Sequence, residues 1–179
     1  MGETTAKLKN KIRVIPNFPK KGIMFQDIFS LTENVETFEY IIKYISRLAK
    51  KNKITKVIGI EARGFIFASA VALKNKIGFV PIRKKGKLPG KVYKKKYKLE
   101  YGYDEIEIQQ GSILKKDKVL IIDDLIATGG TAIASAKLLQ KFYIRKPKFF
   151  FVIDLYNLGG SEKLVKLNYD VISMVATLG

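Results

Sequence analysis

Short apolar runs alternate along this chain with segments of helical periodicity, and this alternation limits the folds that the sequence can adopt. The apolar runs are residues 57–60, 78–82, 119–122 and 149–153. Between and before these runs, helical spacing of apolar residues marks 34–52, 64–75 and 131–142. Unbroken apolar runs are typical of strands buried on both faces by covering helices. The pattern predicts an α/β fold with a central parallel β-sheet flanked by helices.

Length and composition fit one domain spanning residues 1–179. A chain of 179 residues is of ordinary size for a single domain, and 47% hydrophobic with 28% charged residues is a globular balance. No apolar run approaches the ~20 residues of a membrane-spanning helix, and the N-terminal segment lacks the apolar core of a signal peptide. We therefore expect a cytoplasmic protein without a membrane partner.

The sequence contains neither cysteine nor histidine, which excludes several kinds of chemistry. Without cysteine there are no disulfides, thiolate nucleophiles or cysteine metal sites. Without histidine there is no imidazole base, so hydrolysis by a Ser-His-Asp or Cys-His arrangement is excluded. An enzyme of this composition has to work with carboxylates, cationic side chains, hydroxyls, backbone amides and a hard metal such as Mg²⁺.

The chain is strongly basic, with 34 Lys and Arg against 16 Asp and Glu and a formal net charge of +18. Such a field attracts phosphorylated substrates, and it also suits nucleic-acid binding. Only five of the basic residues are arginine, at positions 13, 47, 63, 83 and 145. Abundant lysine is also what A/T-rich codons supply, so the overall charge does not decide between a functional role and a composition bias.

Polar residues follow several predicted strands at the edge where parallel strands end. Glu61 and Arg63 follow the first strand, Arg83 the second and Asp154 the last. Ligands of parallel sheets bind beyond the carboxyl ends of the strands. We therefore expect the functional site at this edge.

Residues 119–131, VLIIDDLIATGGT, carry the most specific signal. Two carboxylates, Asp123 and Asp124, end an apolar run, and a glycine-containing turn then opens a helix. Glycines admit an anion close to backbone N–H groups, and a helix N-terminus favours phosphate. Carboxylates beside a phosphate site suit the paired hydroxyls of a ribose phosphate; the alternative is an acidic pair that only caps the helix. The expected phosphate contacts are Ala127, Thr128, Gly129, Gly130 and Thr131.

This string resembles the phosphoribosyl-pyrophosphate (PRPP) motif of the type I phosphoribosyltransferases. Other segments resemble, in the same order along the chain, the adenine phosphoribosyltransferase branch of that family. They are PNFPKKGIMFQDI (16–28), GIEARGFIF (59–67), VPIRKKGKLPG (80–90), LEYG (99–102) and LYNLGG (155–160). The resemblance spans nearly the whole chain.

The resemblance implies the type I phosphoribosyltransferase fold, a central parallel β-sheet flanked by helices. It implies a small hood from the N-terminal segment, about residues 1–34, and a mobile lid over about residues 87–103. The implied reaction, part of purine salvage, converts adenine and PRPP to AMP and pyrophosphate. It implies Mg²⁺ as cofactor, held mainly through PRPP with no certain protein ligand. It also implies a homodimer, and no nucleic-acid partner is expected.

The resemblance also assigns roles within the phosphate-binding part of the site. The 5-phosphate is assigned to residues 127–131, and the ribose hydroxyls are assigned to Asp123 and Asp124. The residues assigned to pyrophosphate are Arg63, Arg83 and Lys87. Fixed cations suit a leaving group on which negative charge develops, so Arg63 is also a catalytic candidate.

The base-binding part of the site follows in the same way. Phe25 and Leu155 would sandwich the adenine ring, with backbone groups near Met24 reading its edge. Glu100, in the lid, is the catalytic candidate for the proton that adenine loses from N9. Gln26 departs from the family pattern, in which many relatives have arginine, so its effect on base binding or on the dimer is open.

Two other interpretations stay open. A phosphoribosyltransferase for hypoxanthine, guanine, xanthine or orotate would keep the phosphate site, but residues 155–157, Leu-Tyr-Asn, lack the lysine expected for reading an oxopurine. A regulator that keeps the fold and binds nucleic acid is supported only by the net charge of +18. Its affinity would fall steeply with salt.

Overall fold

The structure, a computed structural model, describes residues 2–99 and 102–179. The helices are α1 (Gly2–Lys11), α2 (Phe29–Thr32), α3 (Val35–Lys51), α4 (Gly64–Asn75), α5 (Gly130–Leu139) and α6 (Gly160–Lys166). The strands are β1 (Arg13–Pro16), β2 (Met24–Asp27), β3 (Lys56–Ile60), β4 (Gly78–Lys84), β5 (Val92–Leu99), β6 (Gly102–Gln109), β7 (Val119–Ile126), β8 (Lys148–Leu155) and β9 (Asp170–Thr177). Two short 3₁₀ turns are η1 (Gln140–Phe142) and η2 (Tyr156–Leu158).

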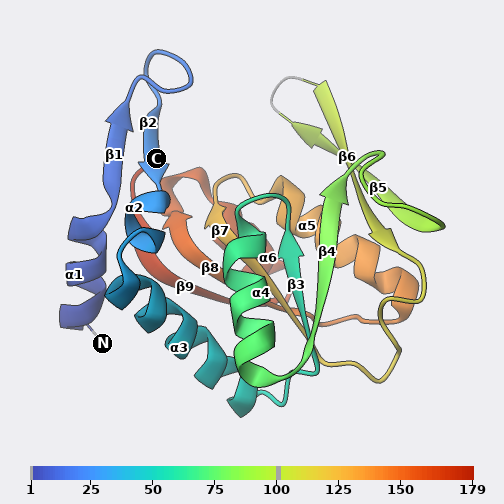
Figure 1. The fold of residues 1–179 in the computed structure, drawn as a ribbon. Coiled ribbons are helices and arrows are strands. Elements are labelled where there is room, and N and C mark those ends of the chain that lie inside the picture. Colours follow the sequence, from blue (N-terminus) through green and yellow to red (C-terminus); the bar gives the residue numbers. More distant parts are fainter. Residues whose placement is uncertain (1, 100–101) are drawn as a thin grey trace.

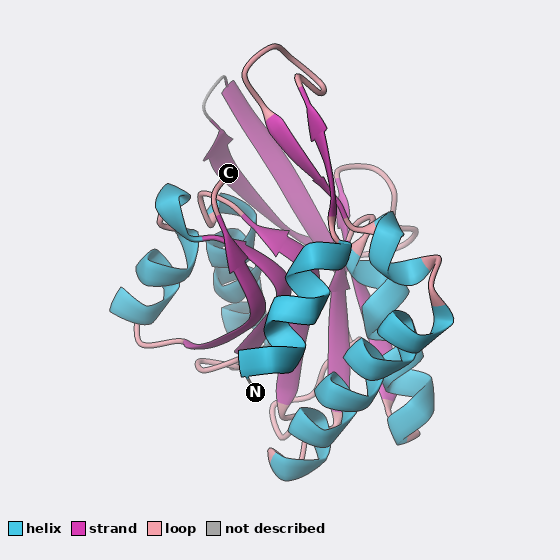
Figure 2. Cartoon of the chain, turned by 90° about the vertical axis from the view of Figure 1, so that its left-hand side faces the viewer, coloured by secondary structure: helices cyan, strands magenta, loops and turns pink. Residues whose placement is uncertain are grey.

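A seven-stranded sheet in the order β5-β6-β4-β3-β7-β8-β9 forms the centre of the described fold (Figure 1). The strands from β4 to β9 in this order run parallel, and β5 and β6 extend one edge as an antiparallel hairpin. Helices pack against the sheet on both sides (Figure 2). The predicted α/β fold with a central parallel sheet is confirmed.

Alternate residues of the central strands pack into two cores, one on each face of the sheet. Along β8, Phe149 and Phe151 face the core that α5 and α6 cover, whereas Phe150 and Val152 face the core under α3 and α4. All four side chains are at most 1% exposed. Burial on both faces is the reason why these strands consist of unbroken apolar residues.

The N-terminal segment adds a hood to one end of the sheet. β1 and β2 pair antiparallel as a separate two-stranded sheet, with Ile15 opposite Phe25. In Figure 1 this hairpin rises at the same end of the fold as the β5–β6 hairpin. α1 is absent from the predicted helices. Leu8 of α1, and Ile12 directly after it, belong to the core on the α3 side.

Most of the segment predicted as a mobile lid, residues 87–103, forms strands where the structure describes it. β5 pairs with β6 along its whole length. Tyr93 and Tyr97 pack against the core on the α5 side, and the Tyr93 ring meets Phe142 edge-on at 5.2 Å between centroids. Lys94 pairs with the buried Glu107 at 3.2 Å. The base of this segment is therefore an extension of the sheet.

Two C-terminal elements, α6 and β9, are also absent from the predicted elements. β9 pairs parallel with β8 from Asp170 opposite Lys148 to Thr177 opposite Leu155, and so completes the sheet at its far edge. None of the helices in the described ranges combines the length and the apolar character that a membrane span requires.

Candidate active site

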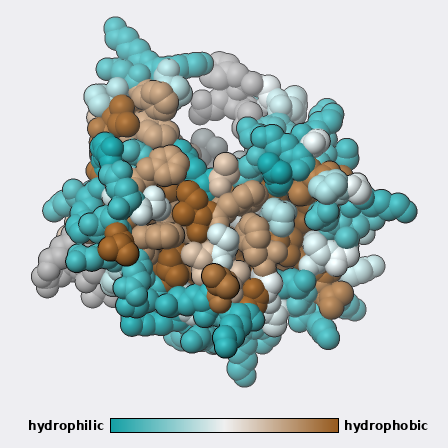
Figure 3. Space-filling view, in the orientation of Figure 1, coloured by the Kyte–Doolittle hydropathy of each residue, from teal (hydrophilic) through white to brown (hydrophobic). Residues whose placement is uncertain are grey.

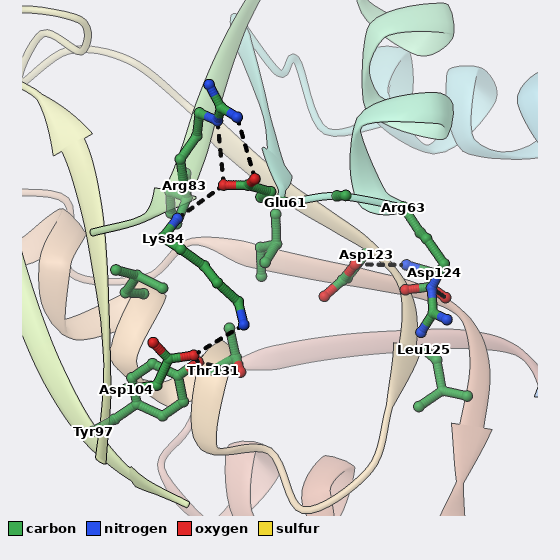
Figure 4. Close-up of a pocket in the computed structure, with 14 residues that line it drawn as sticks. Glu61, Arg63, Arg83, Lys84, Tyr97, Asp104, Asp123, Asp124, Leu125 and Thr131 are labelled. Carbon is green, nitrogen blue, oxygen red and sulfur yellow. Dashed lines mark hydrogen bonds and ion pairs between the residues drawn. The ribbon is translucent and has the colours of Figure 1, made fainter. Parts of the chain in front are cut away.

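The carboxyl ends of β3, β4 and β7 border a cavity of about 530 Å³. Parallel sheets bind their ligands at this edge. The structure brings charged residues from separate segments together there (Figure 4), namely Glu61, Arg63, Arg83, Lys84, Asp104, Asp123 and Asp124.

Glu61, at one wall of the cavity, pairs with two cationic side chains. Its carboxylate accepts hydrogen bonds from Arg83 Nε and Nη2, both at 3.2 Å, and from the Lys84 backbone N–H at 2.9 Å. Lys87 Nζ lies 2.8 Å from Oε1 of the same carboxylate. Burial raises the pKa of Glu61, but the hydrogen bonds from Lys87 and Arg83 outweigh it and lower the pKa to about 2. Glu61 therefore stays ionised and holds Arg83 and Lys87 next to each other.

Asp123 and Asp124 lie on β7 at another wall. Arg63 Nε is 2.6 Å from Asp124 Oδ2, and the Asp124 backbone N–H donates to Asp123 Oδ1 at 2.9 Å. Burial, and then the neighbouring Asp124 carboxylate, raise the pKa of Asp123 well above its ordinary value. A ligand that donates hydrogen bonds to Asp123 would favour its ionised form, which suits a sugar hydroxyl.

The turn between β7 and α5 lines a smaller cavity of about 140 Å³ beside Asp123. Gly129 has a φ of +80°, in the left-handed region that favours glycine, and α5 begins at the next residue. The first N–H groups of a helix lack intrahelical partners, so this turn suits a phosphate. β7 continues to Ile126, four residues beyond the predicted end of the strand, so the acidic pair lies within the strand.

Gly160, at the start of α6, packs directly on this turn. A Cβ atom at Gly160 would lie 2.2 Å from the Ala127 carbonyl oxygen and 2.7 Å from the Gly129 nitrogen. Lys163 Nζ, on the same helix, donates to the Thr128 carbonyl oxygen at 3.1 Å. α6 therefore supports the turn from behind, and only glycine fits at the point of contact.

Tyr97 connects the β5–β6 hairpin to the same turn. Thr131 Oγ1 donates to the Tyr97 hydroxyl at 3.2 Å, which in turn donates to Asp104 Oδ2 at 3.3 Å. Lys84 Nζ lies 3.3 Å from that Asp104 oxygen. Burial raises the pKa of Tyr97, so the hydroxyl keeps its proton. The Thr131 hydroxyl, a predicted phosphate donor, is thus engaged with Tyr97 in this structure.

Phe25, on β2 of the hood, lies over Arg63. The Arg63 guanidinium carbon is 5.5 Å from the centroid of the Phe25 ring, and Phe18 meets this ring edge-on at 5.0 Å. The neighbouring Met24 is 46% exposed. Gln26 is buried, and its side-chain amide donates to the Met24 carbonyl oxygen at 3.4 Å.

The structure divides the residues predicted for pyrophosphate into two groups. Arg63 pairs with Asp124, whereas Arg83 and Lys87 pair with Glu61. Leu155 is buried at the end of β8, and Glu100 lies outside the described residues.

Several residues of the site received no role from the sequence, namely Glu61, Lys84, Tyr97, Asp104 and Gly160. Glu61 directly follows a predicted strand, which is a usable signal. Tyr97 lies in a run of lysines, so the alternation of apolar and polar residues that marks a strand is not visible there. The need for glycine at position 160 follows only from its contact with the turn in the folded structure.

A turn suited to phosphate, an acidic pair and a cluster of fixed cations lie at one end of a parallel sheet, and this is the arrangement that a phosphorylated sugar would require. The family model for the phosphoribosyl transferase domain matches residues 30–175. The adenine phosphoribosyltransferase of Pelagibacter ubique is 49% identical over 94% of this chain and 96% of its own length. The chain belongs to the phosphoribosyltransferase family, among the adenine phosphoribosyltransferases.

Solved structures agree with this assignment. The crystal structure of adenine phosphoribosyltransferase from Thermoanaerobacter pseudethanolicus has a TM-score of 0.89 and 39% identity, covering 97% of this chain and 99% of that one. The enzyme from Saccharomyces cerevisiae, crystallised with an imino-altritol bisphosphate and adenine, has a TM-score of 0.86 and 36% identity, covering 97% of this chain and 99% of that one.

Proposed function

We propose that this protein transfers the 5-phosphoribosyl group of PRPP to adenine, giving AMP and pyrophosphate in purine salvage. One observation carries the proposal: the turn at 127–131 and the acidic pair on β7 adjoin the same cavity as the Glu61 cation cluster. PRPP carries a 5-phosphate, two ribose hydroxyls and a pyrophosphate, which match these three parts. Phosphate contacts come from Ala127 to Thr131, and ribose contacts from Asp123 and Asp124.

Electrostatics explains how such a site would speed the reaction. Breaking the bond between C1′ and pyrophosphate develops positive charge on the ribose and negative charge on the leaving group. Arg83 and Lys87 are already fixed by Glu61, so they stabilise that negative charge with little rearrangement. Arg63 would join them by turning from Asp124 once the ribose hydroxyls engage the acidic pair.

Adenine binds in this proposal between the hood and the end of β8. Phe25 supplies a ring for stacking and Met24 supplies backbone groups. Leu155 is buried in this structure, so its predicted contact with adenine requires that its side chain become accessible when the base binds. The support is that Phe25 lies beside Arg63, which lines the cavity, and that the yeast relative was crystallised with adenine.

Glu100 is proposed to manage the N9 proton of adenine. The support is its place in the chain, since Tyr97, three residues earlier, contacts Thr131 of the turn proposed to bind phosphate. Glu100→Ala should lower kcat far more than it weakens PRPP binding. An equal loss in kcat and in PRPP affinity, measured by steady-state kinetics and calorimetry, would argue against a proton-transfer role.

Mg²⁺ enters the proposal through the substrate. Mg²⁺ prefers oxygen ligands, which the pyrophosphate of PRPP supplies. Asp123 and Asp124 face the cavity and would meet the ion there. When bound with PRPP, Mg²⁺ would neutralise charge on the leaving group. Turnover should stop with EDTA and return when Mg²⁺ is restored.

A homodimer in the cytoplasm completes the proposal. On the face shown in Figure 3, hydrophobic side chains gather over the middle of the molecule, where α4 lies in Figure 1. Leu73 of α4 is 83% exposed and Val35 of α3 is 76% exposed. The hydrophobic patch in Figure 3, and exposed apolar side chains such as these, support subunit contact. Sedimentation equilibrium of wild type and Leu73→Glu should give a dimer and a weakened dimer.

Pyrophosphate release tests the base specificity. The assay contains PRPP, Mg²⁺ and one of adenine, hypoxanthine, guanine or orotate. Release with adenine alone is expected. Release with another base would retain the phosphate site but overturn the roles of Met24, Phe25 and Leu155, and no release with any base would favour a regulator that binds nucleic acid.

A further inference from the structure

A second cavity lies at the end of the sheet opposite to the active site. Its volume is about 630 Å³, and it lies where β3, β7 and β8 begin. Its lining comes from the three segments 51–54, 115–119 and 143–148. The active site lies beyond the carboxyl ends of the central strands, so the length of β7, roughly 25 Å, separates the two cavities.

Cations dominate the lining of this second cavity. Seven of its 13 lining residues are Lys or Arg, against 34 of 179 residues in the whole chain. The one acidic lining residue is Asp117, whose oxygens accept hydrogen bonds from Thr55 Oγ1 and the Leu114 N–H, both at 2.8 Å. A lysine-rich composition alone would spread cations evenly, so their density here calls for a local explanation.

Most of these cations lack an anionic partner. Lys148 pairs with Asp170, and Lys115 Nζ lies 5.6 Å from the centroid of the Tyr143 ring. Within residues 2–99 and 102–179, no carboxylate pairs with the remaining five, which are Lys51, Lys53, Lys118, Arg145 and Lys146. Like charges around one cavity repel each other, and a ligand with several negative charges would relieve that repulsion.

Tyr143 adds an aromatic surface to the same cavity. Its side chain is 71% exposed, and its φ of 64° lies in the left-handed region that bulky residues avoid. Neither burial nor backbone preference therefore accounts for a tyrosine at this position. An exposed ring beside unpaired cations can stack on a base while the cations bind phosphates.

We propose that this cavity is a second binding site, which takes a nucleoside polyphosphate with its phosphates on the five cations and its base on Tyr143. The volume falls within the range of small-molecule sites, about 300–1,000 Å³. The several charges of a polyphosphate match five cations better than one phosphate group does. The site shares no residue with the proposed active site.

A single-stranded nucleic acid is the less favoured occupant, because three segments surround one cavity instead of forming a track. Another basic cavity, of about 640 Å³, is lined by Lys94, Lys95, Lys137 and Lys141 but by no aromatic residue. This other cavity provides a matched control for the effect of charge alone.

Calorimetric titration tests the proposal on the full chain, with ATP and inorganic tripolyphosphate as probes and saturating AMP present to fill the active site. Arg145→Glu/Lys146→Glu should weaken both probes by about tenfold or more. Lys137→Glu/Lys141→Glu, which makes the same charge change at the other cavity, should leave both affinities within about twofold. Both variants should keep wild-type turnover with adenine, which verifies folding and separates this site from the proposed activity.

Tyr143→Ala distinguishes a nucleotide from a simple polyanion. It should weaken ATP by about fivefold or more and leave tripolyphosphate unchanged. Absence of ATP binding, or equal losses in the two charge variants, would overturn the proposal. An oligonucleotide of about 12 bases that binds more tightly than ATP, and that both charge variants weaken, would overturn it in favour of a nucleic-acid surface.

Discussion

Glu61→Gln removes the charge that holds the cation cluster while it keeps the size of the side chain. The wild-type carboxylate is 9% exposed and bonds to Arg83, Lys84 and Lys87. Its pKa is about 2, against an ordinary value of 4.5. At 1.36 kcal/mol per pKa unit, the folded protein favours the ionised form by on the order of 3 kcal/mol. This is an upper limit for the variant, because the glutamine oxygen still accepts hydrogen bonds.

The sign of the shift fixes the pH dependence of this effect. A pKa that is lowered on folding stabilises the protein fully above about pH 4.5, and this stabilisation is lost as the pH falls toward 2. Glu61→Gln should therefore lower Tm at pH 7 by as much as roughly 6–12 °C, at 2–4 °C per kcal/mol for a chain of this length. Thermal unfolding followed by circular dichroism at pH 7 and pH 3 should show a smaller difference at the lower pH.

Catalysis gives a second readout. Without Glu61, Arg83 and Lys87 have to be ordered when PRPP binds, at about 0.5–1.5 kcal/mol for each side chain, so kcat/KM for PRPP should fall roughly tenfold. The matched control is Glu162→Gln, which removes an exposed pair with Lys166 at 2.6 Å and should change neither quantity appreciably. Tighter pyrophosphate binding in the Glu61 variant would refute the reasoning, because it would mean that Glu61 competes with the leaving group for these cations.

Gly160→Ala should raise KM for PRPP and lower Tm, because its Cβ would lie 2.2 Å from the Ala127 carbonyl oxygen. The control is Gly78→Ala, whose Cβ would meet no atom nearer than 3.8 Å. Equal changes of KM and Tm in the two variants would contradict the packing argument. Tyr97→Phe should tighten PRPP binding by up to about fivefold in calorimetry, because it frees a phosphate-turn hydroxyl, and weaker binding would show that Tyr97 itself assists the substrate. Asp123→Asn should weaken PRPP binding yet raise Tm at pH 7. Because the pKa of Asp123 is raised on folding, the folded state binds more protons than the unfolded state between pH 3.8 and this raised pKa. The stability of the wild type therefore falls as the pH rises through this range, and the variant, which has no carboxylate to ionise, avoids that loss. A thermal shift series from pH 4 to pH 8 in which the variant gains nothing at high pH would contradict this.

Elements whose evidence is local were predicted well from the sequence. The helix predicted at 34–52 is α3, and its start has a local cause, since Asn34 Oδ1 accepts a hydrogen bond from the Thr37 N–H at 3.0 Å. The buried strands also follow from composition, because burial on both faces demands apolar residues at every position. The turn at 127–131 is contiguous in the chain, so its glycines and the helix that follows indicate phosphate without knowledge of any distant residue.

The β5–β6 hairpin shows why other elements were missed. Along β5, Tyr93, Lys95 and Tyr97 are half-buried, while Lys94, Lys96 and Lys98 are exposed, so the burial alternates as in an ordinary strand. Lysine occupies positions of both kinds, and the hydropathy pattern therefore shows no period of two. A lysine can lie on the inner side because its aliphatic stem packs while its ammonium group reaches solvent. The sequence therefore showed no sign of these two strands, which begin within the segment predicted as a lid.

The cluster of Glu61 with Arg83 and Lys87 was not predicted from the sequence either, and the register of the parallel strands explains how it forms. Ile60 lies opposite Ile82 in the parallel pairing of β3 with β4, so the next residues, Glu61 and Arg83, come together although they are 22 positions apart in the chain. The predicted strands at 57–60 and 78–82 end at these two isoleucines, so alignment of their carboxyl ends would have placed Glu61 against Arg83. No comparable rule leads to Tyr97, because its contact with Thr131 depends on how far the hairpin folds over the turn. Side chains that follow paired parallel strands are therefore predictable neighbours, whereas contacts across a hairpin require the three-dimensional structure.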